Sequence, residues 1–457
     1  MNSRIRRPYE RKTVSRSGAL VFGLGLGALF ATMAIALALA MPLLSTRLEN
    51  APMYARTYYR KMFPPPQYLP TPAPTVSFEI APPQNEPDTI EEAASLGSLE
   101  EAPSTNTEVV LASVNVAEQS LEPSADDQTG SVQLVSPTTD VALNPTGQAR
   151  QLTGLNHQWQ TWNNCGPATI TTYMSYFGRT ETQVDGALFL KPNKDDKNVS
   201  PYQLAAYAQS VGMEAILRQG GSVEQLKQFI SNDFPVLVET WLIHDGDGLG
   251  HYRLITGYND DTGQFITSDS LSGPQYPVSY DQFDSDWRVF NRLYIVVFQP
   301  EQADLVAGII GPDLQDQVMY DKLVAAANAE IEANPTDQIA YFNKGEALTR
   351  LERYEEAAAA FDQARKIGLH WRRLWYQFTP FEAYYATGRY QDVLDLANAT
   401  IANSGGLEEA YYYKGLALHS LGQPGAEEAL QDALDYNPNF AAAQVAMETL
   451  HGSVVGP

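Results

Sequence analysis

The spacing of hydrophobic and polar residues divides the chain into segments that predict different kinds of structure. Residues 19–44 form one long apolar run without a charged side chain, whereas residues 62–149 are polar and interrupted by prolines. Short strand-like apolar runs separated by turn residues follow up to about residue 300. Beyond residue 313 the strand pattern ends, and apolar residues recur at the three-to-four-residue spacing of helices. We predict a multidomain protein with a transmembrane helix, a disordered linker, an α+β domain and an all-α solenoid.

The length of 457 residues leaves room for about three folded units. We assign residues 1–18 to a cytoplasmic basic tail, 19–44 to the transmembrane helix, 45–150 to a proline-rich acidic linker, 151–302 to the α+β domain and 313–450 to the helical repeats.

The apolar run is long enough to cross a bilayer. As a helix, residues 19–44 would extend about 39 Å, against a hydrocarbon thickness of ~30 Å. Basic side chains precede the run and only Glu10 opposes them, so the positive-inside rule keeps the N-terminus in the cytoplasm and places the rest outside the cell membrane. A cleaved signal peptide is the alternative, because Ala38-Leu39-Ala40 has the small residues of a cleavage site. The basic residues are Arg4, Arg6, Arg7, Arg11, Lys12 and Arg16.

Charge separates the linker from the folded segments. Residues 62–149 contain no Lys or Arg and 13 acidic side chains, and such a segment cannot bury enough apolar surface to offset its ordering entropy. By flexible-chain scaling it would extend on the order of 50 Å. The whole chain has a formal charge of −24 and no basic cluster after Lys61, so nucleic acid is not an expected partner.

A helix is predicted to begin at the single cysteine. Asn163 or Asn164 is a good N-cap, Pro167 suits the first turn and Gly178 is a natural stop. The apolar residues at helical spacing, which we expect on the buried face, are Ile170, Met174 and Phe177.

This position favours a reactive thiol at Cys165. The N-terminus of a helix stabilises negative charge and lowers a thiol pKa, as a nucleophilic thiolate requires. Gly166 has no side chain and would leave space for a substrate carbonyl. A single cysteine excludes an intrachain disulfide framework and a zinc site built from several thiolates, and we expect neither a metal nor another cofactor. A small buried hydrophobic residue is the alternative reading of Cys165.

His251 is the best candidate for a general base. It follows a glycine-rich loop and opens a strand predicted over residues 252–258. A turn over residues 259–263 and a returning strand over 264–268 would place Asp269 roughly opposite His251. An acceptor there would fix the orientation and tautomer of the imidazole, the third role in a nucleophile–base–orienter set.

These residues resemble the motifs of papain-like cysteine peptidases, and more narrowly the bacteriocin-processing family thirty-nine peptidases and their stand-alone relatives. The resemblance implies a papain-like fold over about 151–300, with Cys165 as nucleophile, His251 as base and Asp269 as orienting acid. It also implies an oxyanion-hole role for Gln160 beside the Cys165 N–H, and substrate contacts at Gly166 and Gly250. The matching segments are Gln160, Asn164–Ala168, Gly250–Tyr252, Gly257–Tyr258, Ser268–Ser270 and the run from Tyr280 to Phe298.

Several alternatives remain open. Gln158 is a second candidate for the oxyanion-hole donor, and His244 is a second candidate for the base. The loop with Asp245 and Asp247 faintly resembles calcium loops but lacks the later ligands of an EF-hand. The remaining histidines are His157, which lies before the cysteine, and His370, His419 and His451, which we expect at the surface of the helical segment.

The helical segment resembles tetratricopeptide repeats. Tyr341–Leu348 and Arg353–Ala364 fit one helix hairpin, Gly388-Arg389-Tyr390 begins a degenerate second unit and Tyr413–Gly422 begins a third. A short solenoid of such units has a concave face that suits protein or peptide docking, while the alternative is a buttress for the α+β domain. Small residues that would let the paired helices approach closely are Gly345, Ala357, Ala364 and Gly415, and Phe381 occupies a position where a small residue is expected.

We therefore predict a membrane-anchored, extracytoplasmic cysteine peptidase that acts on a peptide or protein substrate and docks a partner on its repeats. In the predicted reaction His251 takes the proton of Cys165, the thiolate attacks an acyl carbon and water completes hydrolysis. A catalytically silent peptide-binding scaffold and a thiol acyltransferase are the alternatives. The chain has no Gly-x-x-x-x-Gly-Lys-Ser/Thr motif, so the resemblance does not imply the ATP-driven exporter role.

Overall fold

The computed structural model describes residues 68–72, 141–191, 198–242 and 248–452. The predicted transmembrane helix at 19–44 and most of the predicted linker lie outside these ranges. Among the residues that the structure describes, no helix has the length and apolar character needed to span a bilayer. The described chain divides by secondary structure into a sheet domain (residues 141–314) and a helical domain (residues 316–452).

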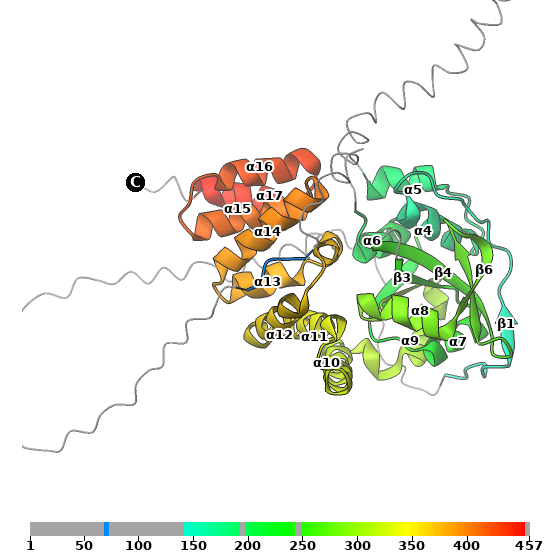
Figure 1. Cartoon of the computed structure of the whole chain (residues 1–457). Coiled ribbons are helices and arrows are strands. Elements are labelled where there is room, and N and C mark those ends of the chain that lie inside the picture. The colour runs from blue at the N-terminus through cyan, green and yellow to red at the C-terminus, as the bar shows by residue number, and fades with distance from the viewer. Residues whose placement is uncertain (1–67, 73–140, 192–197, 243–247, 453–457) are drawn as a thin grey trace, which may run out of the picture. The chain divides into compact units, whose positions relative to one another are not determined.

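An antiparallel sheet forms the centre of the sheet domain (Figure 1). Its path is β2-β7-β3-β4-β5-β6, and β1 pairs with the far end of β4. Side chains alternate between two buried faces, so that Val236 and Val238 enter one core and Leu237 enters the other. The strands are β1 (Ala149–Gln151), β2 (Glu214–Arg218), β3 (Val236–Leu242), β4 (Leu249–Asn259), β5 (Gln264–Asp269), β6 (Gly273–Ser279) and β7 (Tyr294–Phe298).

Helices cover both faces of this sheet. Helices α4 and α6 contribute to the core that contains Leu237, whereas α7, α8 and α9 contribute to the core that contains Val236. Helices α6, α7 and α8 each begin after a serine cap; for example, the Ser200 hydroxyl accepts the backbone N–H of Gln203 at the start of α6. The helices are α4 (Cys165–Ser175), α5 (Gln183–Leu190), α6 (Pro201–Ser210), α7 (Val223–Ser231), α8 (Tyr280–Trp287) and α9 (Ala303–Ile310), with 3-10 turns η2 (Arg288–Phe290), η3 (Pro300–Gln302) and η4 (Gly311–Leu314).

The predicted helix and hairpin of this domain are confirmed. The helix begins at Cys165 after Asn164, and Gly178 has the positive φ of a residue that follows a helix end. The predicted turn over 259–263 connects β4 and β5. The buried surface of α4 is wider than expected, because all its residues after Cys165 are buried and not only one apolar face.

Residues 141–151, most of which the sequence analysis assigned to the linker, lie against the sheet domain. The backbone N–H of Asn144 donates to the Asn232 side chain at 2.8 Å, and Ala149 pairs with Asn259 in the sheet. Leu143 is partly buried and packs against the core that contains Val236. The folded domain therefore begins about ten residues before the boundary that composition indicated.

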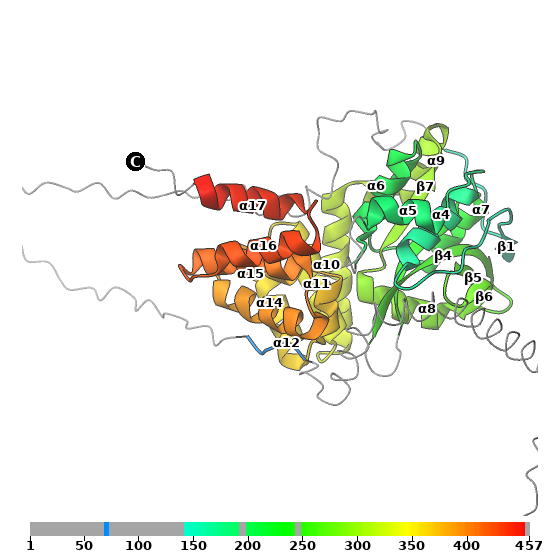
Figure 2. The same ribbon diagram turned by 90° about the horizontal axis from the view of Figure 1, so that it is seen from above.

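The helical domain is a succession of helices in which each contacts the next (Figure 2). Gly345 of α11 lies where an added Cβ would meet the Phe361 ring at 2.6 Å, and Gly415 of α15 similarly faces Leu430. Phe381, at the position expected to be small, is buried and stacks on Tyr413 with ring centroids 4.9 Å apart. The elements are α10 (Asp316–Ala333), α11 (Gln338–Arg350), α12 (Tyr354–Ile367), η5 (Trp371–Trp375), α13 (Thr379–Ala386), α14 (Tyr390–Ser404), α15 (Glu408–Ser420), α16 (Ala426–Tyr436) and α17 (Ala441–Gly452).

Buried and partly buried polar contacts join the two domains. Arg288 donates to Glu330 and Asp337 at 2.8 Å each, and the Asn291 amide donates to Glu346 at 2.7 Å. Asn291 and Glu346 are both buried. Separating the domains would therefore break the hydrogen bond between these two polar side chains and expose both of them. This favours a structural role for the first helices of the helical domain.

Candidate active site

Cys165 is the first residue of α4 and is half-buried. The chain enters the helix through Asn163, which has the positive φ of 51° that asparagine tolerates better than most residues. Asn164 is the N-cap residue, but its side chain makes no capping bond and instead donates to the Gln183 side chain at 2.8 Å. The bond from Asn164 to Gln183, the first residue of α5, therefore stabilises the helix N-terminus at which the thiol lies.

His251 lies at the start of β4 and is 1% exposed. Its side chain makes a hydrogen bond with the Cys165 thiol, and its Nε2 atom lies 3.0 Å from Asp269 Oδ1. Since Nε2 is engaged by the carboxylate, Nδ1 is the ring nitrogen that remains for the thiol. The structure thus brings together the three residues that the sequence analysis selected as nucleophile, base and orienting acid.

A β-bulge determines that Asp269 faces His251. The pairing nearest the turn, continued without interruption, would set Asp269 beside Leu254, on the opposite side of the strand from His251. The bulge between Ile255 and Gly257 shifts the pairing by one residue and returns Asp269 to the side of His251. The expected juxtaposition is present, but it depends on an irregularity that the turn position does not reveal.

Asp269 is fully buried and accepts several hydrogen bonds. Besides His251, the backbone N–H groups of Leu271 and Ser272 donate to Oδ1 at 2.8 and 2.9 Å, and Arg253 Nε donates to Oδ2 at 2.8 Å. Burial alone would raise the pKa of this carboxyl, but His251, Arg253 and the backbone donors hold the pKa well below its usual range. The carboxylate is therefore charged and fixed in orientation.

The thiol and the imidazole have pKa values displaced toward an ion pair. Burial disfavours both charged forms, yet the hydrogen bond and charge of His251 lower the pKa of Cys165 below its ordinary value. Against the same penalty of burial, the Asp269 hydrogen bond and the Cys165 interaction raise the pKa of His251 to about 9. A thiolate beside an imidazolium is the form of a cysteine that attacks acyl carbons.

Two further residues at the site were not selected from the sequence. Arg253 contacts Asp269. Its position could have been predicted, because a residue two positions after His251 lies on the same face of the strand. His157 Nδ1 lies 2.8 Å from the Ser268 hydroxyl, and burial lowers the pKa of His157. Nothing in the spacing of His157 indicates this position.

The two candidate oxyanion-hole glutamines have different surroundings. Ser270 donates to the Gln160 side-chain oxygen at 2.9 Å, and the Gln160 backbone N–H donates to the Ser270 carbonyl, so Gln160 is fixed beside the residue that follows Asp269. The Gln158 amide instead donates to Thr171, and its oxygen accepts the Gln183 N–H at 2.7 Å. Both ends of the Gln158 amide are therefore used to join α4 to the start of α5. Gln160 is the better candidate for the oxyanion-hole donor.

The two glycines expected at a substrate site have packing roles in the structure. A Cβ on Gly166 would lie 3.3 Å from Val199, so the space that the sequence analysis left for substrate is filled by the core. A Cβ on Gly250 would lie 2.9 Å from the ring of Tyr376, which comes from the helical domain. Close packing, and not substrate access, accounts for the missing side chain at both positions.

The remaining candidates are placed as follows. His244, Asp245 and Asp247 lie outside the described residues, and within the described ranges no group of three or more His, Cys, Asp or Glu side chains is arranged to hold a metal ion. His370, expected at the surface, is only half-exposed because it begins η5 and lines a cavity.

One comparison with known protein families matches most of the sheet domain. Residues 149–295 match a family model described as the Peptidase_C39 like family. A comparison with curated proteins found no match. Residues 149–295 therefore form a C39-like peptidase domain, and the chain that follows is helical.

Solved structures resemble parts of the chain. The peptidase domain of Streptococcus ComA, a bifunctional ABC transporter, is 19% identical and covers 33% of this chain and 98% of its own, with a TM-score of 0.26. A putative C39-like peptidase from Bacillus anthracis is 14% identical and covers 34% and 98%, with a TM-score of 0.29. MamA from Desulfovibrio magneticus RS-1 is 19% identical and covers 31% and 90%, with a TM-score of 0.25.

Proposed function

We propose that this protein is a cysteine peptidase in which Cys165, His251 and Asp269 form the catalytic triad. The observation that supports the proposal is the hydrogen-bonded series from the Cys165 thiol through the His251 ring to the buried Asp269 carboxylate. A cysteine kept only for packing has no need of a partner histidine whose second nitrogen is held by a carboxylate.

The proposed reaction begins from the thiolate–imidazolium pair. The Cys165 sulfur attacks the carbonyl carbon of a peptide bond, and the oxyanion forms hydrogen bonds with the Cys165 backbone N–H and the Gln160 amide. His251 then protonates the leaving amine, which releases the first product and leaves a thioester on the sulfur. Neutral His251 next removes a proton from water, hydroxide attacks the thioester, and Cys165 is regenerated.

The buried carboxylate supports the first of these steps. Asp269 holds the imidazole in the tautomer that presents Nδ1 to sulfur, and its charge favours the imidazolium that must form. Arg253 and two backbone N–H groups hold Asp269 itself, so its side chain has no alternative direction. The site is therefore preorganised before a substrate binds.

Labelling with a thiol-directed acyl electrophile tests the proposal. Because Cys165 is the only cysteine in the chain, any thioester reports on this residue alone. We expect stoichiometric acylation of the wild-type chain, strong loss in His251→Ala and no change in His419→Ala, a matched control at an exposed histidine of the helical domain. Slow acylation that is equal in all three proteins would contradict the proposal and favour a silent scaffold.

The fate of the acyl group separates hydrolysis from transfer. We propose water as the acceptor, so the labelled enzyme should release free acid at the same rate with and without added amines. Release that requires an amine acceptor would instead assign the thiol chemistry to an acyltransferase.

We further propose that the apolar run at 19–44 anchors the enzyme in the cell membrane and that the repeats dock a substrate or partner. The length and lack of charge of the run support the first proposal, and the succession of contacting helices supports the second. Retention of the chain in washed membranes and its digestion by protease added outside intact cells test the anchor. A full-length chain found in the soluble fraction would contradict it.

A further inference from the structure

A short segment of the predicted linker lies on the helical domain. Residues 68–72 are extended, and Figure 1 shows them in blue beside the helical domain. The Leu69 N–H donates to the Leu369 carbonyl at 2.9 Å, and Arg365 Nε donates to the Pro70 carbonyl at 2.8 Å. Leu69 is 4% exposed and belongs to the hydrophobic core of the helical domain. We call residues 68–72 the strap.

The surface beneath the strap is shaped for it. Tyr68 forms an antiparallel bridge with His370, and the two rings meet edge-on with centroids 6.3 Å apart. The Tyr68 ring lies over Gly368, where a Cβ would approach it to 3.6 Å. Arg365 has a side chain only 1% exposed, and Asp392 and the strap carbonyl supply two of the acceptors that a buried guanidinium needs.

The chain is held again where the described residues resume. Val141 packs on Gly308 of α9, where an added Cβ would lie 3.3 Å from the valine. Residues 73–140 therefore connect two fixed points and keep the strap near its site at an effective concentration on the order of a millimolar or less. A motif whose dissociation constant as a free peptide lies below this concentration is bound for most of the time when it is tethered in this way.

The partners of the strap directly precede residues that pack on the active-site strand. Leu369 and His370 lead into η5, whose Arg372 donates to the Gly248 carbonyl at 3.1 Å. Tyr376, which follows η5, covers Gly250 next to His251. One short stretch of chain thus contacts the strap on one side and the start of β4 on the other.

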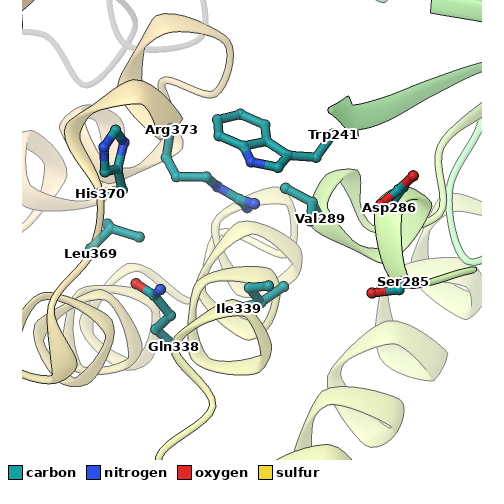
Figure 3. Close-up of a pocket in the computed structure, with 9 residues that line it drawn as sticks. All are labelled: Trp241, Ser285, Asp286, Val289, Gln338, Ile339, Leu369, His370 and Arg373. Atoms are coloured by element: carbon teal, nitrogen blue, oxygen red, sulfur yellow. The ribbon is translucent and has the colours of Figure 1, made fainter. Parts of the chain in front are cut away.

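A pocket that is partly open to solvent lies beside this stretch. A cavity of about 210 Å³ is lined by Leu369, His370 and Arg373 from the helical domain and by Trp241 and Val289 from the sheet domain (Figure 3). Arg373 of η5 borders this partly open pocket, so its side chain has room to shift if an outside contact of η5 is lost.

We propose that the strap is a releasable docking segment that holds η5 against the strand of His251 and so stabilises the active site. The occupant of this surface is the chain's own Tyr68–Pro72, an extended segment with a buried leucine followed by proline. The effect on catalysis rests on the proposed function, whereas the docking and its effect on η5 do not.

Hydrogen exchange of the full chain tests the docking. We expect Leu69→Asp, and more weakly Leu69→Ala, to increase amide exchange in residues 369–376 and 248–253. Leu99→Asp is the matched control, because it adds the same charge to the same linker. Exchange in these two segments that is equal in wild type and both Leu69 variants would overturn the proposal, as would an equal increase in the control.

A peptide supplied in trans gives an independent readout. A fluorescent peptide of residues 64–75 should bind Leu69→Asp at least tenfold more tightly than wild type, since the strap of the wild-type chain already occupies the surface. It should also return the exchange of residues 369–376 toward the wild-type level. Equal affinity for the two proteins, or no binding to Leu69→Asp, would contradict the proposal.

Alkylation of Cys165 connects the strap to the site. We expect Leu69→Asp to react at least threefold more slowly than wild type and the peptide to restore the rate. If wild-type Cys165 reacts no faster than a free thiol, the proposed function fails, while the exchange and peptide experiments still decide whether the strap docks. A fast wild-type reaction that Leu69→Asp leaves unchanged would remove the strap's role in catalysis.

Discussion

Replacing Asp269 by asparagine removes the charge that supports the imidazolium while keeping nearly the same shape. Asp269 accepts hydrogen bonds from His251 and from two backbone N–H groups through one oxygen, and from Arg253 through the other. In Asp269→Asn the oxygen can keep the first set, but the new amide group must face the Arg253 donor. We therefore expect a loss of stability of about 1–3 kcal/mol together with a change in the titration of His251.

The size of the titration change follows from the pKa of His251. Its value of about 9 exceeds the ordinary 6.5 by an amount worth roughly 3 kcal/mol, which Asp269 and Cys165 supply together against the cost of burial. The hydrogen bond to Asp269 is the largest single favourable contribution, and a neutral amide oxygen is a weaker acceptor for the imidazolium than a carboxylate. Asp269→Asn should therefore lower the pKa of His251 by about one unit or more, or about 1.4 kcal/mol. The imidazolium is favoured below its pKa, so the variant should lose it at a lower pH than wild type.

The pH dependence of alkylation by iodoacetate measures this change. The reagent is an anion, so its reaction with the Cys165 thiolate is assisted by the neighbouring imidazolium and slows when His251 loses its proton. We expect the alkylation rate to fall with a midpoint of about pH 9 in wild type and of about pH 8 or below in Asp269→Asn. Asp260→Asn is the matched control. Asp260 lies in the turn of the same hairpin and forms an ion pair with Lys227 of α7, so the variant makes the same substitution at a carboxylate that does not contact His251. An unchanged midpoint in Asp269→Asn would refute the assignment of Asp269 as the support of His251.

Three other outcomes are expected. Gly250→Ala should lower the free energy of unfolding by about 1–3 kcal/mol in a denaturant titration, because its Cβ would meet the Tyr376 ring at 2.9 Å; an unchanged midpoint would show that the ring is not fixed there. Gln160→Ala should slow acylation of the thiol by about a hundredfold at constant melting temperature, whereas Gln158→Ala should lower the melting temperature with a smaller effect on rate. The stability that comes from protonation of His251 should be complete below pH 6.5 and disappear as the pH rises through about 9, so the difference in urea unfolding free energy between wild type and His251→Ala should become smaller over this range.

The sequence indicated the local elements of the site because their signals are local. A proline in the first turn favours a helix start at Cys165, and Gly178 favours its end, although the Asn164 side chain makes no capping bond. The hairpin that carries His251 and Asp269 was likewise predictable from its turn. The bulge at Ile255–Gly257 was not, since it depends on packing across several strands.

Contacts between distant segments account for what the sequence analysis missed. The sequence analysis expected substrate contacts at Gly166 and Gly250. In the structure, Val199 and Tyr376, which lie elsewhere in the chain, fill the space beside these two glycines. Leu69 lies in a stretch whose composition predicts disorder, yet it enters the core of helices about three hundred residues away. Composition describes the average of a segment, whereas a single buried leucine is enough to dock it.

The central claim is that His251 keeps the sulfur of Cys165 deprotonated at neutral pH, and the ultraviolet absorbance of the thiolate tests it most directly. With one cysteine in the chain, the difference between wild type and Cys165→Ser isolates this group. We predict a titration midpoint clearly below that of an ordinary thiol in wild type and a midpoint at or above it in His251→Ala. A wild-type midpoint equal to that of an ordinary thiol, unchanged when His251 is removed, would contradict the account.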